Sequence, residues 1–219
     1  MYFSNHINYS GSIMLYRYLQ IFLCVFICVF SRNTYAEMTI ENLIYDDSKP
    51  FHIKILDTLP SEAIIQIGAD GAENTIIEFM DYFCGYCKKI HPELVELANE
   101  RDDVRVIFLQ HPILSESSKV VAQMVIAANY QQKGFELHHA IFSISGSLTQ
   151  EKLSQAIKES GVNSIKLKID SSKDETEKII ILSSFLAGGI GARGTPSIFV
   201  NEIFTPGYIS KEQIINMLK

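Results

Sequence analysis

Two cysteines three positions apart, Cys84 and Cys87, follow a short apolar segment, and this arrangement constrains the chain more than any other feature. Residues 75–80 are rich in β-branched and aromatic side chains, which predicts a buried strand. Residues 84–100 repeat apolar side chains at helical spacing, with Pro92 as an expected kink. The sequence therefore predicts an α/β fold in which a buried strand leads directly into a helix that begins at Cys84.

A cysteine at the start of a helix is chemically favoured as a thiolate. The helix N-terminus offers unpaired N–H groups and a partial positive charge, both of which lower a thiol pKa. Cys87 lies one turn later on the same face, where it could attack a mixed disulfide formed at Cys84. The pair therefore predicts thiol-disulfide exchange, with Cys84 attacking and Cys87 resolving.

Other uses of the pair are weaker. A zinc ion needs four ligands, and Cys84, Cys87 and His91 leave only distant histidines to complete the set. Covalent haem would need histidine where Lys88 stands. A purely structural disulfide would close a loop too short to stabilise the fold much. Zinc and the structural disulfide stay open as alternatives; no metal and no cofactor is expected.

An acidic residue precedes the pair within the predicted strand. By alternation from Ile76, Glu78 points the same way as Met80, toward an apolar interior. Burial would raise its pKa and let it exchange a proton with Cys87 through water. The alternative is that Glu78 faces solvent on an edge strand.

A proline opens a later strand. Thr195 and Pro196 precede the apolar run 197–200, and a proline at the first strand position lacks the N–H that the ladder would use. If the bond before it is cis, the turn would present backbone groups to an extended peptide.

The first 36 residues have the shape of an export signal. A twelve-residue run, 19–30, is almost wholly apolar and too short for the roughly 20 residues of a transmembrane helix. Small residues before Glu37 predict cleavage after Ala36, with an uncleaved anchor as the alternative. Met14 would give a more ordinary start than Met1. The first two of the four cysteines, Cys24 and Cys28, would leave with the signal.

The rest of the chain divides by pattern. Residues 37–60 are predicted to be an irregular leader, followed by a first part of the sheet domain over 61–114 with strands at 63–67, 75–80 and 104–109. Helical patterns at 117–131, 135–144, 149–160 and 174–186 predict an inserted helical domain over 115–187. Residues 188–219 would return to the sheet with strands at 197–200 and 203–208 and a helix at 211–218. The charge alternation at 166–178 is interpreted as a solvated face.

Composition excludes some functions. The net charge is −6, and losing residues 1–36 removes two arginines and no acid, which leaves −8. Phosphate backbones favour basic proteins, so nucleic acid is not an expected partner. The stretch 189–194 matches the dinucleotide pattern G-x-G-x-x-G, but it ends a helical pattern and precedes a strand, the wrong context for that motif. His138 and His139 are interpreted as core or surface histidines of a helix.

These motifs together resemble the DsbA-like family of exported thiol-disulfide oxidoreductases. The match rests on EFMDYFCGYCKK, HPILSESSKVVAQ and GGIGARGTPSIFVN in that order and covers about residues 60–219. The resemblance implies a thioredoxin-like fold with a central mixed sheet and an inserted helical domain. It also implies Cys84 as attacking cysteine, Cys87 as resolving cysteine, Glu78 as buried acid, and Thr195 with Pro196 as a cis-proline loop facing the pair.

The dipeptide between the cysteines departs from the strongest oxidants of that family. Gly85 and Tyr86 between the cysteines, and Thr195 before the proline, are similar to the residues at the corresponding positions of DsbC-type isomerases. Without a histidine there, the Cys84 pKa is expected above about 3.5 and below that of a free thiol. The redox potential is expected to be more reducing than about −120 mV.

The expected function is oxidation of cysteine-containing polypeptides after export to the periplasm. The pair would be reoxidised by a membrane thiol oxidase of DsbB type. Substrate would be bound around Gly85, Tyr86, Thr195 and Pro196, and a monomer is expected because no heptad stripe occurs in 37–60. The alternatives are an isomerase or reductase of the same fold, or a polypeptide-binding module whose disulfide is inert.

Overall fold

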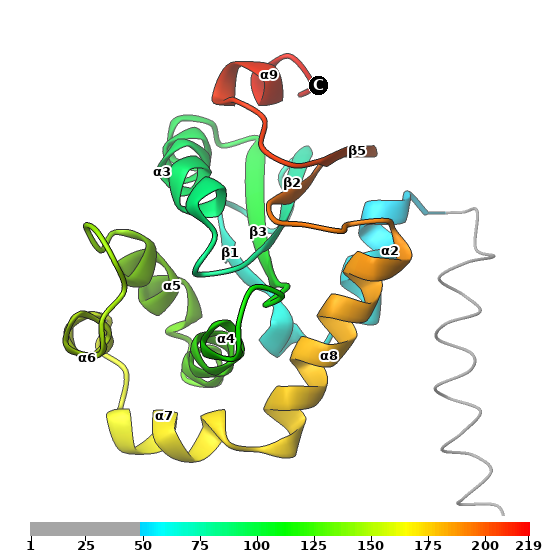
Figure 1. Cartoon of the computed structure of the whole chain (residues 1–219). Helices are drawn as coiled ribbons and strands as arrows, with labels where there is room; N and C mark the ends of the chain where they lie inside the picture. Colours follow the sequence, from blue (N-terminus) through cyan, green and yellow to red (C-terminus); the bar gives the residue numbers. More distant parts are fainter. Residues whose placement is uncertain (1–48) are drawn as a thin grey trace, which may run out of the picture. The chain divides into compact units, whose positions relative to one another are not determined.

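A computed structural model describes residues 49–219 of the chain (Figure 1). The predicted signal, its cleavage after Ala36, the choice between Met1 and Met14 and most of the leader lie outside the described residues. Within residues 49–219, no helix is both long enough and apolar enough to span a bilayer.

A five-stranded mixed sheet forms the centre of the fold, in the order β1-β3-β2-β4-β5. The parallel pair is β2 with β3, and all other neighbours are antiparallel. The strands span β1 (Ile65–Ile67), β2 (Asn74–Met80), β3 (Val104–Gln110), β4 (Ser197–Val200) and β5 (Ile203–Pro206).

Helices surround this sheet (Figure 1). The helix α3 connects the parallel strands β2 and β3 and packs on β3, while five helices, α4 to α8, lie between β3 and β4 in the chain. The helices span α2 (Phe51–Thr58), α3 (Gly85–Glu100), α4 (Glu116–Asn129), α5 (Gly134–Phe142), α6 (Gln150–Glu159), α7 (Ser164–Ser171), α8 (Asp174–Gly189) and α9 (Lys211–Ile215), and a 3-10 turn covers Ser61–Ala63.

The helices between β3 and β4 pack mainly on one another. The helix α4 contacts α5, α7 and α8, and α5 contacts α6. The helix α5 also packs on β1 of the sheet, and α8 packs on β3. A helical block thus follows β3 as the sequence indicates, while its separate domain status over 115–187 stays a prediction.

The central strand β2 explains the burial of Glu78. Every residue of β2 is buried, because β3 and β4 pair with its two edges and side chains cover both faces. Glu78 pairs in register with Phe108 of β3 and Ile198 of β4, and its side chain is 0% exposed. The edge-strand alternative is therefore wrong.

Two segments differ from the sequence-based expectation. The prediction of an irregular leader over 37–60 is wrong for Phe51–Thr58, which form α2 with Ile55 fully buried. Pro50 stands just before this helix, where a missing N–H costs nothing.

The second difference lies in the charged stretch. Residues 164–171 form α7, which Asn163 caps through its side chain. The solvated-face interpretation of residues 166–178 holds for Lys166 and Lys168, which are exposed, but not for Leu167 and Asp170, which are buried. The closing helix, expected over residues 211–218, is also shorter than predicted, and α9 ends at Ile215.

Candidate active site

The cysteine pair stands at the N-terminus of α3, as the spacing indicates. Cys84 is the N-cap residue, and its sulfur accepts a hydrogen bond from the backbone N–H of Cys87 with an N to Sγ distance of 3.4 Å. Cys87 is completely buried on the inner face of the helix. Both are free thiols in this structure, so the pair is described in its reduced form.

The two thiols have opposite acidities. The pKa of Cys84 is lowered to about 5, first by a hydrogen bond from the Cys87 thiol and further by the Thr195 side chain and the backbone N–H groups of Cys87 and Tyr86. Burial raises the pKa of Cys87 far above its usual value, and Cys84 and Glu78 add to this increase. Cys84 is therefore the thiolate at neutral pH, while Cys87 holds its proton.

The proline loop faces the pair from the start of β4. Thr195 and Pro196 are joined by a cis peptide bond, as the sequence suggested. The Cys84 sulfur lies 3.1 Å from the Thr195 carbonyl oxygen, which accepts a hydrogen bond from Cys84 when this thiol is protonated. Segments 111 positions apart in the chain thus meet at one sulfur atom.

Glu78 lies beneath the pair. Its strand neighbours on the same face, Ile76 and Met80, belong to the core cluster that includes Cys87. Neither carboxyl oxygen has a hydrogen-bond partner at ordinary distances. Burial raises the pKa of Glu78 to about 8; the nearby Cys87 thiol partly opposes this, and the charge of Cys84 reinforces it. The carboxyl group is therefore protonated at neutral pH.

Gly85 and Tyr86 form the outer surface of the pair. The Tyr86 side chain is 61% exposed, and its ring lies 5.8 Å from that of Tyr208, measured between centroids. The structure thus places the predicted residues around one helix terminus, with Cys84 and the proline loop in direct contact.

Sequence reasoning missed Asp81. Its carboxylate accepts hydrogen bonds from the backbone N–H groups of Phe83 at 2.8 Å and Leu114 at 3.0 Å, and its own carbonyl accepts from the N–H of Cys84 at 3.0 Å. Asp81 therefore ties the turn before α3 to the loop after β3. An aspartate just before a helix start is a typical turn residue, and this was the available signal.

Three histidines, one from α3 and two from α5, lie close together. His91 Nε2 lies 2.9 Å from His139 Nδ1, and His138 Nδ1 lies 2.9 Å from the Tyr82 hydroxyl. Burial lowers the pKa of His91 to about 3 and that of His138 well below its usual value. His91, which the zinc alternative needs, is thus engaged by His139, and no group of three or more potential ligands is placed to hold a metal within residues 49–219.

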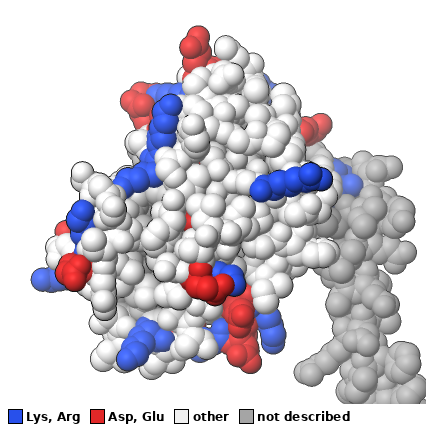
Figure 2. Space-filling model, in the orientation of Figure 1, with Lys and Arg blue, Asp and Glu red and all other residues white. Residues whose placement is uncertain are grey.

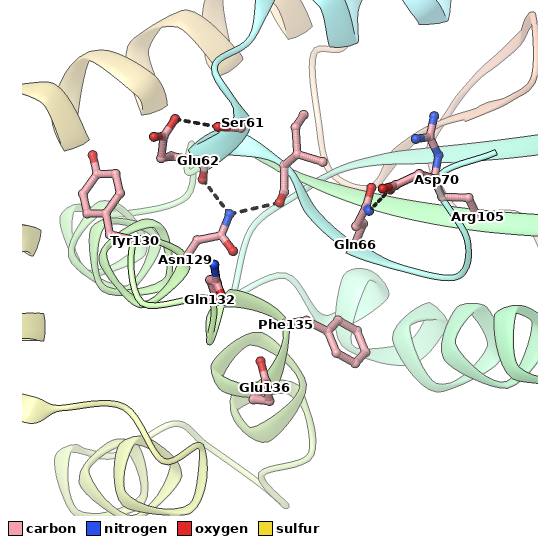
Figure 3. Close-up of a pocket in the computed structure, with 12 residues that line it drawn as sticks. Ser61, Glu62, Gln66, Asp70, Arg105, Asn129, Tyr130, Gln132, Phe135 and Glu136 are labelled. Carbon is pink, nitrogen blue, oxygen red and sulfur yellow. Dashed lines mark hydrogen bonds between the residues drawn. The ribbon is translucent and has the colours of Figure 1, made fainter. Parts of the chain in front are cut away.

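A polar pocket of about 740 Å³ lies elsewhere, beside β1 (Figure 3). The Asn129 amide spans one side by donating to the carbonyls of Glu62 and Ile64, both at 3.0 Å, and the Gln66 amide donates to Asp70. None of the predicted site residues lines this pocket. The cysteine chemistry is therefore not located there.

The charge distribution agrees with the composition. On the face shown in Figure 2, lysines and arginines are scattered singly and do not form a continuous basic surface. This face therefore offers no track for a nucleic-acid backbone.

Comparisons with known proteins agree with this geometry. Residues 61–219 match the family described as Thioredoxin. No protein with a curated description matches the chain significantly.

Solved structures of similar fold cover most of the described residues. A thioredoxin-like oxidoreductase from Silicibacter pomeroyi DSS-3 is 28% identical, with a TM-score of 0.67 over 72% of this chain and 91% of that one. A periplasmic thioredoxin-like protein from Salmonella enterica serovar Typhimurium is 25% identical, with a TM-score of 0.66 over 75% and 93%. The thiol-disulfide exchange protein alpha-DsbA2 from Wolbachia pipientis is 24% identical, with a TM-score of 0.63 over 85% and 95%.

The expected thioredoxin-like α/β fold is thereby confirmed. The family match covers the sheet, the cysteine pair and the proline loop together. The chain belongs to the thioredoxin family.

Proposed function

We propose that this protein is an exported oxidase that introduces disulfide bonds into newly translocated polypeptides. The observation that carries the proposal is the low pKa of Cys84, about 5, beside a resolving cysteine that keeps its proton. A stabilised thiolate stabilises the reduced form of the pair, and a pair with a stable reduced form is a good oxidant.

The reaction proceeds in two exchanges. A substrate thiolate attacks the Cys84 sulfur of the oxidised pair, the bond between Cys84 and Cys87 breaks, and Cys87 leaves as a thiolate that takes a proton from Glu78. A second substrate thiolate then attacks the substrate sulfur of the mixed disulfide and expels the Cys84 thiolate. The substrate gains one disulfide, and the pair gains two electrons.

Several features support the roles proposed around the pair. The pKa of Glu78, about 8, leaves it protonated at neutral pH and able to donate when Cys87 departs. The Thr195 carbonyl that touches Cys84 belongs to a loop whose backbone can align an extended peptide. Pro196, Gly85 and exposed Tyr86 would complete the surface that receives the substrate.

Export and recycling belong to the same proposal. Residues 1–36 have the composition of a cleavable signal, and the similar Salmonella protein is described as periplasmic. A membrane thiol oxidase of DsbB type would return the pair to its disulfide form. The protein would act as a monomer without metal or cofactor.

Refolding of a reduced test protein measures the proposed activity. The oxidised protein should transfer its disulfide and accelerate recovery of the test protein, and Cys84→Ser should abolish the transfer. Cys87→Ser should also abolish the transfer, because without Cys87 the protein cannot carry the disulfide that the substrate thiolate attacks. Unimpaired transfer by Cys84→Ser would reject the proposal.

An isomerase is the second candidate, favoured by Gly85 and Tyr86 between the cysteines and by Thr195 before the proline. Recovery of a scrambled-disulfide substrate by a stable oligomer would select it over the oxidase. Titration against glutathione addresses the inert alternative: a potential below about −300 mV marks a structural bridge, and one between about −120 and −270 mV marks an exchanging pair.

A further inference from the structure

A pocket of about 320 Å³ is lined by the attacking cysteine, and neither Thr195 nor Pro196 of the proline loop is part of its lining. Cys84 and Gly85 form one wall, and the opposite wall comes from the end of α5 and the loop that leads to α6. In the proposed function, substrate is covalently bound at the Cys84 sulfur during exchange. The chain next to the reacting cysteine must therefore pass the mouth of this pocket.

The lining is mainly apolar. The rings of Tyr82 and Phe142 lie 5.1 Å apart between centroids, and the half-buried Ile144 and Leu148 complete the apolar surface. The Tyr82 hydroxyl is already engaged by His138, so the ring is the part of Tyr82 that remains for a ligand. No acidic side chain lines the pocket.

The one charged group in the lining is used to hold the wall. Lys88 donates from Nζ to the carbonyl of Ile144 and, at 2.9 Å, to that of Gly146. Lys152 donates from Nζ to the intervening carbonyl of Ser145 at 2.6 Å. Three consecutive carbonyls are thus tied by two lysines, which keeps the wall in place without a ligand and leaves the pocket preformed.

An extended peptide offers its side chains alternately to opposite sides, with about 3.3 Å between residues. A peptide bound along the proline loop at Thr195 therefore directs a side chain beside its cysteine toward the opposite wall, where the pocket opens. A preformed apolar pocket binds a large apolar side chain most tightly. Transfer of that side chain out of water is favourable, and it buries no polar group that lacks a hydrogen-bond partner.

We propose that this pocket is a specificity subsite that accepts an aromatic or large aliphatic side chain adjacent to the reacting cysteine of a polypeptide substrate. The inference rests on the proposed exchange at Cys84 and adds the substrate class to it. Unfolded chains expose such side chains beside their cysteines, whereas folded proteins bury them.

The test compares peptides that differ only beside a cysteine. Oxidised protein is mixed with reduced two-cysteine peptides whose first cysteine is flanked on both sides by Phe, Ala or Glu, and the rate of disulfide transfer is followed by acid quenching and mass spectrometry. The Phe peptide should react about tenfold faster than the Ala peptide, a factor that burial of one large side chain supplies. The Glu peptide should be no faster than the Ala peptide.

Two exposed serines of the wall provide a matched pair of variants. Ser147 lines the pocket and Ser145 does not, and both side chains are exposed, so a tryptophan at either position disturbs no core packing. Ser147→Trp should fill the pocket and bring the Phe to Ala ratio near one. Ser145→Trp should keep the wild-type ratio and should react with glutathione at the wild-type rate.

The outcomes separate the subsite from the proposed function. Equal rates for the Phe and Ala peptides in the wild-type protein, together with normal reaction with glutathione, would overturn the subsite and leave the exchange activity standing. A full preference retained in Ser147→Trp would also overturn the subsite. Failure with every peptide and with glutathione would overturn both proposals.

Discussion

At the scale of single residues, the site depends on a division of acidity between neighbouring groups. Cys84 and Cys87 are one helical turn apart, yet the pKa of Cys84 falls to about 5 while that of Cys87 rises far above its usual value. The difference arises because hydrogen bonds converge on the Cys84 sulfur, whereas Cys87 is buried beside Glu78. Attack and resolution are therefore assigned by environment and not by residue type.

Glu78 provides a prediction about pH. The unfolded chain releases this proton above about pH 4.5, whereas the folded protein keeps it until about pH 8, so Glu78 lowers stability progressively as the pH rises between these values. Glu78→Gln cannot ionise. In the oxidised protein, where neither cysteine titrates, the variant should match the wild type near pH 4.5 and exceed its Tm by at least about 3 °C at pH 8.

Thermal unfolding across this pH range measures the effect. The same variant should slow disulfide transfer, because Cys87 loses its proton donor. Parallel Tm profiles for wild type and Glu78→Gln would contradict a raised pKa for this carboxyl group.

Asp81 provides a second prediction at the residue scale. Both carboxylate oxygens accept backbone N–H groups, so an amide nitrogen at this position would face a donor and leave one N–H unpaired. Asp81→Asn should therefore cost about 1–3 kcal/mol of unfolding free energy, measured by urea denaturation. It should also raise the Cys84 pKa, measured by the pH dependence of alkylation, because the turn that positions Cys84 loosens. A stable variant with an unchanged alkylation profile would show that Asp81 does not position the cysteine.

At the scale of elements, the contact between α5 and β1 requires a glycine. A Cβ at Gly134 would lie 2.4 Å from Asn129 Oδ1 and 2.7 Å from Ile65 Cδ1. The Asn129 side chain cannot yield easily, because its amide is bound to the carbonyls of Glu62 and Ile64. The start of α5 can therefore approach the sheet only without a side chain.

Gly134→Ala should lower the free energy of unfolding by about 1–3 kcal/mol, the usual cost of forcing an atom into a packed site. Gly188→Ala in α8 is the matched control, since a Cβ there meets nothing within 4 Å. It should raise stability by about 0.5–1 kcal/mol, because alanine has the higher helix propensity. Chemical denaturation of both variants checks the pair, and equal effects would refute the packing argument.

At the scale of the whole molecule, the redox state of the pair and the stability of the fold are linked. The folded pKa of Cys84 is about 5 against an ordinary value of 9.0, so its contribution to stability is fully present above about pH 9 and is lost as the pH falls through about 5. The oxidised protein has no thiolate to stabilise. Oxidation therefore removes a pH-dependent stabilisation from the folded state.

The reduced protein should accordingly gain stability relative to Cys84→Ser as the pH rises from 5 to 8, by several degrees in Tm. The serine variant serves as control because its hydroxyl does not titrate in this range. Calorimetry of both proteins at several pH values measures the difference. A constant difference between them would show that Cys84 has an ordinary pKa in the folded state.

The sequence alone established the local part of this protein. The strand that carries Glu78, the helix that begins at Cys84, the strands at 104–109 and 197–200 and most helices after β3 follow from apolar periodicity and turn residues, which act over a few residues. The missed helix Phe51–Thr58 has only two turns and lies between prolines, so its local signal is weak and its stability comes from burial of Ile55.

Only the tertiary structure decided the chemistry. The Thr195 carbonyl meets the Cys84 thiol across 111 positions of sequence, and the central place of β2 buries Glu78 on both sides. Asp81 contacts Leu114 through the same long-range packing. Hydrogen-bond distances and desolvation depend on which segments come together in space, and a thiol or carboxyl pKa depends on both. For that reason the sequence predicted the cysteine pair and the direction of the Cys84 pKa shift, but not the size of that shift, the burial of Glu78 or the pocket beside the pair.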